Sequence, residues 1–158
     1  MDAIAGYLSQ IDRVLASAHS LFPADAAFAH GPLAEVSVPG APETTSELGR
    51  QADAAGQRHR ELTGQAASLH ESVRQTVAAV AAVMGQLGAE AGALRDAARS
   101  EGAAWRELAD DPAAVVQLVR AMDNRLAGMQ RLIEQASEHA DDAAAELANH
   151  SDSYTTLV

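Results

Sequence analysis

The sequence predicts an all-α protein in which a long antiparallel helical hairpin has a shorter N-terminal helix packed alongside. Three observations predict this three-helix, coiled-coil-like bundle. Apolar residues recur at alternating spacings of four and three, which keeps one side of a helix facing a partner over many turns. Residues that end helices gather at two places along the chain. Alanine is the commonest residue and only five residues are aromatic, so the helix axes are expected to lie close together.

The first helix is predicted over residues 1–22, with Asp2 at its start and Pro23 directly after it. From Pro23 to residue 44 the apolar periodicity disappears, and Pro32, Pro39, Gly40 and Pro42 indicate a connecting segment. Such a linker would let the first helix pack along the others. The expected apolar stripe of this helix comprises Ile4, Leu8, Ile11, Leu15, Ala18 and Phe22.

The second helix is predicted over residues 45–100, because the apolar stripe passes through six glycines without losing its phase. Each interior glycine costs about 1 kcal/mol relative to alanine, so a break or a kink between Gly56 and Gly64 is the alternative. The segment from Thr76 to Ala89 has no charged residue, and we expect the first helix to cover it. The stripe comprises Leu48, Ala52, Ala55, His59, Leu62, Ala66, Leu69, Val73, Val77, Val80, Met84, Leu87, Ala91, Leu94 and Ala98.

The third helix is predicted over residues 111–151, since Asp111 and Pro112 combine an N-cap carboxylate with a proline in the first turn. A hairpin that turns near residue 106 would place Asp141 and Asp142 close to Arg74. Residues 1–158 are then expected to form a single helical domain. The third stripe comprises Val115, Val119, Met122, Leu126, Met129, Ile133, Ala136, Ala140, Ala143, Leu147, His150 and Tyr154.

The net charge of −11 disfavours binding to nucleic acid or to anionic lipid surfaces, because both repel an acidic protein. The N-terminus has no cation before Arg13 and no continuous apolar run, which is unlike a secretory signal peptide. The longest weakly polar run, Val77 to Leu87, is about half the length of a bilayer span. We therefore expect no integral membrane segment.

No pattern of residues indicates catalysis, a cofactor or a metal site. The residue three positions before each of the six histidines is never a carboxylate, although helical di-iron sites require that spacing. The chain has no cysteine and no nucleophile motif such as GxSxG. The sequence thus predicts that the protein is not an enzyme.

Four residues are candidates for binding a partner. Trp105 falls in the expected turn, where it either closes the end of the bundle or anchors another protein, since aromatic residues dominate binding hot spots. Tyr154, Leu157 and Val158 follow the last charged residue, Asp152, and have no expected contact within the bundle. We favour this terminal end as the binding surface.

The chain resembles two groups of small helical proteins from mycobacteria and related actinobacteria. Residues 108–154 resemble the second half of an uncharacterised helical domain that can precede NlpC-type cell-wall hydrolases. The hairpin with tryptophan in its turn resembles the WXG family, which is exported by ESX (type VII) secretion. The WXG motifs themselves do not carry over, because Arg106 and Glu107 follow Trp105, and Val158 stands where the export motif has an acidic residue.

These resemblances imply a non-enzymatic interaction module: a substrate, adaptor or targeting domain linked to type VII secretion or the cell envelope. Its expected partner is another helical protein or a second copy of itself. It would be cytoplasmic before export and would reach the envelope or the exterior without a classical signal peptide. The alternatives are a self-associating coiled-coil scaffold and the N-terminal regulatory module of a cell-wall hydrolase.

Overall fold

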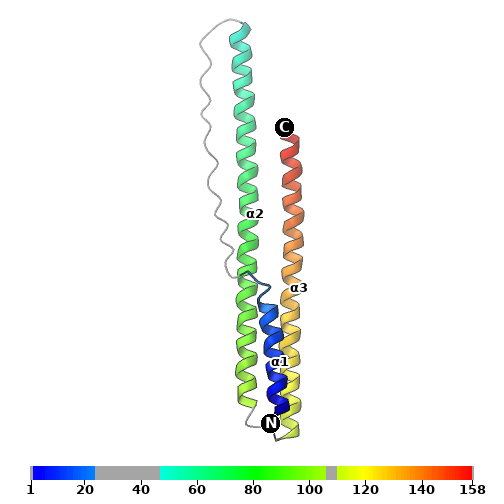
Figure 1. Cartoon of the computed structure of the whole chain (residues 1–158). Coiled ribbons are helices and arrows are strands. Elements are labelled where there is room, and N and C mark those ends of the chain that lie inside the picture. Colours follow the sequence, from blue (N-terminus) through cyan, green and yellow to red (C-terminus); the bar gives the residue numbers. More distant parts are fainter. Residues whose placement is uncertain (1, 24–46, 106–109, 158) are drawn as a thin grey trace. The chain divides into compact units, whose positions relative to one another are not determined.

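The computed structural model describes residues 2–23, 47–105 and 110–157, and it confirms the all-α fold class. Helix α1 comprises Asp2–His19, α2 comprises Glu47–Trp105 and α3 comprises Pro112–Leu157. Helices α2 and α3 run antiparallel as a hairpin, and the shorter α1 packs alongside both (Figure 1). The predicted linker lies outside the described residues, apart from Pro23.

The chain divides into two compact units. Unit 1 comprises Met1–Ala27 and Ala79–Asp142, and unit 2 comprises Phe28–Ala78 and Ala143–Val158. Unit 1 therefore holds α1 with one part of α2 and of α3, and unit 2 holds the remaining parts of α2 and α3. The expectation of a single domain stays a prediction.

Unit 1 contains the main hydrophobic core. Leu15, Leu118 and Met122 are almost completely buried, and they come from α1 and α3. The α1 stripe contributes to this core as predicted, because Leu8, Ile11, Leu15 and Phe22 are buried while Ile4 and Ala18 pack against them. The full buried cluster comprises Leu8, Ile11, Leu15, Phe22, Leu87, Ala91, Ala98, Leu118, Met122, Met129 and Leu132.

Helix α1 ends at His19, three residues earlier than expected. The amide of Leu21 donates to the carbonyl of Ala18, and the amide of Phe22 donates to that of His19, both at 3.1 Å. These three-residue bonds tighten the last turn. Pro23 has no amide proton to donate and disfavours a helical conformation at Phe22. Phe22 still reaches the core.

Helix α1 packs further along α2 than expected. Phe22 lies against Gly88, His19 against Gly92 and Leu8 against Gly102. A Cβ atom at Gly102 would lie 2.9 Å from Cδ2 of Leu8, so the missing side chain lets the two helices approach. The expectation that α1 covers the uncharged segment from Thr76 to Ala89 is therefore wrong, except at its end near Gly88.

Helix α2 is continuous, so the alternative of a break between Gly56 and Gly64 is wrong. The helix also extends to Trp105, five residues beyond the expected end. At the start of α3, the amide of Ala113 donates to Oδ1 of Asp111 at 2.9 Å. Asp111 thus caps α3 as the sequence indicates. Helix α3 continues to Leu157, six residues beyond the expected end.

Burial along α3 follows the expected stripe at Met122, Met129 and Ala143, and it differs from that stripe by one position at other places. Leu118 and Leu132 are buried, whereas Val119 is 38% exposed. Leu118 and Val119 are adjacent and both apolar, so a small rotation of α3 about its axis exchanges which of the two faces the core. The start of α2 departs more strongly, since Leu48 is 76% exposed and Leu62 is 46% exposed. The prediction that this part of the stripe is buried is wrong.

Unit 2 has a thin interior built from small residues. Thr76 of α2 and Ala143 of α3 are buried, and Oγ of Ser72 lies 3.3 Å from Nε2 of His150. This last contact sets the register of α2 against α3. Arg74 forms its ion pair with Glu71 of the same helix at 2.9 Å. The predicted pairing of Arg74 with Asp141 and Asp142 is wrong, because the helices are shifted by about two turns relative to a hairpin turning near residue 106.

Candidate functional site

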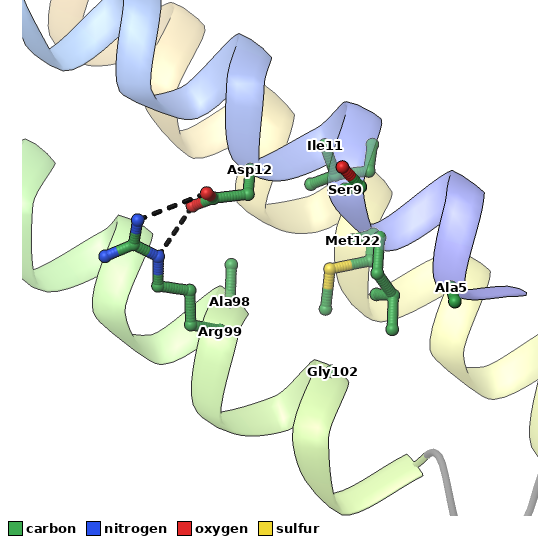
Figure 2. A pocket seen from close by; sticks show the side chains of 9 residues that line it. Ala5, Ser9, Ile11, Asp12, Ala98, Arg99, Gly102 and Met122 are labelled. Atoms are coloured by element: carbon green, nitrogen blue, oxygen red, sulfur yellow. Dashed lines mark hydrogen bonds and ion pairs between the residues drawn. The ribbon is translucent and has the colours of Figure 1, made fainter.

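A groove of about 320 Å³ lies in unit 1 between α1 and α2, with Met122 of α3 at its base. Figure 2 shows Asp12 and Arg99 joined across one end of this groove, with Ala98 and Gly102 along the α2 side. The groove exists because small side chains line α2 where α1 crosses it. Its lining residues are Ala5, Leu8, Ser9, Ile11, Asp12, Ala98, Arg99, Gly102 and Met122.

The polar end of the groove is an ion-pair network that joins α1 to α2. Asp12 accepts hydrogen bonds from Nε and Nη2 of Arg99 at 2.7 and 3.1 Å. It also accepts one from Nε of Arg95 at 3.3 Å. The hydrogen bonds from Arg99, and then Arg95, lower the pKa of Asp12, and the same pairing raises the pKa of Arg99. A carboxylate held this way stays ionised and is a poor general base at neutral pH.

A second ion pair joins α2 to α3 in unit 1. Arg125 donates to Glu101 through Nε at 3.1 Å and through Nη2 at 2.7 Å. This bidentate hydrogen bonding lowers the pKa of Glu101 and raises that of Arg125. On α1, burial and the negative charge of Asp123 raise the pKa of Tyr7. The ion pairs of Asp12 and of Glu101 thus join neighbouring helices of unit 1.

The arrangement gives no support to catalysis or metal binding in the described part of the chain. Within those residues, no group of three or more histidine and acidic side chains is placed to hold a metal ion. His150 contacts Ser72, and His19 lies against Gly92, so both contribute to helix packing. In the groove, the one carboxylate is neutralised by two arginines.

The sequence-predicted binding residues belong to different units. Trp105 is the last residue of α2 in unit 1, where it is partly buried and packs against the core. Tyr154 belongs to unit 2 and is 37% exposed. Leu157 is the last residue of α3, and Val158 lies outside the described residues. Their role in binding a partner stays a prediction.

Sequence reasoning missed an exposed surface at the start of α2. Ser72 contacts α3, and Thr76, one turn later, is buried. Towards the start of α2, the residues on the same face, which are spaced three and four apart, form an exposed line. We call this line the docking face; it comprises Leu48, Gln51, Ala55, Arg58 and Leu62. Three of the five belong to the predicted stripe. At the start of α2 the stripe therefore correctly predicted an apolar face but wrongly predicted that this face is buried.

Helix α2 also contains a stretch that is long and apolar enough to cross a membrane, judged by length and composition alone. Between Val77 and Leu94 the one charged residue is Glu90. Leu87 and Ala91 of this stretch are buried in the core of unit 1, and the other residues between Val77 and Leu94 are exposed or partly exposed. The expectation of no integral membrane segment stays a prediction.

Comparisons of the chain with models of protein families, with curated proteins and with solved structures found no match.

Proposed function

We propose that the protein is a non-enzymatic helical interaction module that serves as a substrate, adaptor or targeting domain in type VII secretion or at the cell envelope. The observation that supports binding is the exposure of the docking face. Leu48 and Leu62 are 76% and 46% exposed on the side of α2 that, further along, packs against α3. A helix from a partner can continue this packing.

The energetic argument concerns these two leucines. Burying a leucine side chain stabilises an interface by about 1.5–3 kcal/mol, because apolar surface leaves water. Ala55 lies between them and lets a second helix approach closely. A partner helix packed here would gain apolar burial that α2 lacks within the described residues. The link to type VII secretion or the envelope rests on the resemblances noted in the sequence.

The proposal is tested by replacing both leucines of the docking face with aspartate. We expect the double variant Leu48→Asp, Leu62→Asp to remain helical by circular dichroism, because both side chains are exposed. Its export from the native host, or its association with the cell envelope, should fall at least tenfold. Unchanged export and envelope association would contradict the proposal.

The matched control is the double variant Val116→Asp, Val119→Asp on α3. These valines are 50% and 38% exposed, so the control introduces the same charge at comparable apolar positions away from the docking face. We expect it to retain export and envelope association. A loss in both variants would mean that added negative charge, rather than the docking face, is responsible.

A further inference from the structure

The register of unit 2 shows how far α2 continues beyond α3. Counting in opposite directions from the contact of Ser72 with His150 places Leu157, the last residue of α3, level with Gln65. Residues 47–64 of α2 therefore extend past the described part of α3 by about 27 Å at 1.5 Å per residue. We call residues 47–64 the α2 extension. The docking face lies almost entirely on it.

The α2 extension has a sequence that is complementary to itself in the antiparallel direction. Full overlap of two copies places Glu47 of one level with Gly64 of the other. At that register Leu48 comes level with Leu62 to within one residue, and Ala55 comes level with itself to within one residue. The apolar residues of the docking face would then meet one another, and alanine would occupy the centre, where the two helices must approach most closely.

The charges agree with the same register. Arg50 comes level with Glu61 of the second copy, and both residues lie on the same edge of the docking face because they are eleven positions, or about three turns, apart. Arg50 is paired with Glu47 in its own helix, and both side chains are exposed. Glu61 is exposed and has no ion pair within the described residues. An antiparallel partner would supply that pair twice, once on each side of the two-fold axis.

The helix ends also suit this arrangement. The last turn of α3 contains no basic residue, so the negative end of its dipole has no cation to oppose it. At the proposed register, the start of α2 from a second copy would lie level with Gly64, one residue from the level of Leu157, with its positive end towards α3. It would thus continue the path of α3 along the docking face, as an extension of the α2–α3 interface of unit 2.

We infer that the docking face binds a second copy of this chain, with the two α2 extensions packed antiparallel about a two-fold axis. Each copy places its Leu48 against Leu62 of the other and its Arg50 against Glu61 of the other. The inference rests on the proposed function in one respect, since both require the docking face to be a binding surface. It goes further by naming the occupant.

The first test is the mass of the purified full chain by sedimentation velocity at micromolar concentration and low ionic strength. We expect a dimer. The variant Leu48→Asp, Leu62→Asp should be a monomer, and the control Val116→Asp, Val119→Asp should remain a dimer. A monomeric unmodified chain, or a dimer that survives the change at both leucines, would overturn the inference.

Charge exchange tests the register. Arg50→Glu and Glu61→Arg should each weaken the dimer about tenfold, because each change opposes like charges at two symmetric positions. The combined variant Arg50→Glu, Glu61→Arg should regain most of that loss, since every pair is restored with its signs reversed. Additive weakening in the combined variant would rule out this pairing.

Cross-linking tests the direction, and the absence of cysteine from the chain makes each introduced thiol unique. Under copper–phenanthroline oxidation, Ala55→Cys should form a disulfide-linked dimer because it lies next to the two-fold axis. Leu48→Cys alone should not, whereas its mixture with Leu62→Cys should. Cross-linking of Leu48→Cys with itself would indicate parallel helices and would overturn the antiparallel arrangement.

The two proposals fail in different ways. A chain that is monomeric in solution, but whose export still depends on Leu48 and Leu62, would overturn the dimer and leave the interaction module standing. A dimer that needs both leucines, in a chain whose export and envelope association do not, would do the reverse. Binding of another protein at the docking face of a monomer would likewise replace the second copy as occupant.

Discussion

Unit 1 and unit 2 are built from the same two long helices, yet they differ in what holds them together. Unit 1 has a third helix, and α1 brings Leu8, Ile11 and Leu15 into a core with Leu118 and Met122. Unit 2 has two described helices, whose buried residues include Thr76 and Ala143 but no large apolar side chain. A regular apolar stripe therefore predicts a helix with one apolar face. Whether that face is buried depends on whether another helix packs against it.

The difference has a physical origin in the number of neighbours. A side chain between two helices remains open to water on both flanks, whereas a side chain among three helices is enclosed on most sides. Leu69 and Val73 of unit 2 are partly exposed on α2, whereas Leu87 and Ala91 of unit 1 are buried beside α1 and α3. Unit 1 should thus carry most of the folding free energy, and unit 2 should remain available for a partner.

The largest expected effect distinguishes the two units by truncating one side chain in each. Met122→Ala should lower the free energy of unfolding by about 2–5 kcal/mol, because it leaves a cavity where a fully buried side chain stood. Leu62→Ala should change it by less than about 0.5 kcal/mol, because Leu62 is 46% exposed. Urea unfolding followed by circular dichroism measures both at a protein concentration low enough to dissociate any oligomer.

Equal losses of unfolding free energy for Met122→Ala and Leu62→Ala would contradict the comparison, since they would show that the start of α2 is as tightly packed as the core.

The variant Val80→Asp tests an intermediate position. Val80 is partly buried on α2, so a charge there should cost an amount between the effects of Met122→Ala and Leu62→Ala. A loss as small as that of Gln130→Asp, an exposed position on α3, would place Val80 in solvent.

The sequence predicted the positions of the helices better than it predicted how they pack against one another. The stripe of α1 and the cap at Asp111 were correct, because both depend on a few adjacent residues. The register of α2 against α3 was wrong, because a seam of alanines fits almost equally well after a shift of one heptad. The contacts that select the register, Ser72 with His150 and Glu101 with Arg125, join residues far apart in the sequence.

The polar network of the groove could be recognised from the sequence only in part. Arg95 and Arg99 are four residues apart, so they share one side of α2. Asp12 lies beside the α1 stripe, next to Ile11. Nothing local to either helix indicated that they would meet, because that meeting depends on α1 packing near Gly102 rather than on the uncharged segment of α2.

The second prediction concerns the loss of stability of unit 1 at low pH. The folded protein lowers the pKa of Asp12 and Glu101 below their ordinary values of 3.8 and 4.5. Near those values the unfolded chain therefore binds more protons than the folded one. The stabilisation from both ion pairs is fully present above about pH 4.5, and it is lost as the pH falls through the lower folded values.

We therefore expect the melting temperature to fall below about pH 4.5 and to fall less steeply in the variant Asp12→Asn, Glu101→Gln. The exposed pair of Glu71 with Arg74 lies within α2 of unit 2 and serves as the control. Glu71→Gln should leave most of the acid dependence in place, because that pair joins no two helices. An unchanged slope in the Asp12 and Glu101 variant would mean that these pairs do not hold unit 1 together.

The smallest expected effect on stability comes from deleting the end of α3. This deletion tests whether the end of α3 contributes to binding without contributing to stability. Tyr154 is 37% exposed, and the hydroxyls of Thr155 and Thr156 bond to carbonyls of their own helix at 3.1 and 2.8 Å. Deleting residues 154–158 should therefore shift the melting temperature by less than about 2 °C, because these contacts are local to one helix end.

The same deletion should still matter for binding if the end of α3 contributes to a partner interface. In the proposed dimer, the start of α2 from the second copy lies close to the level of Leu157, so removing the last turn of α3 would separate the two helix ends. We expect the dimer to weaken and export to fall while the melting temperature of the monomer stays the same. A deletion variant that retains both association and export would show that the docking face binds without help from α3, and Trp105 would then be the remaining sequence-predicted anchor.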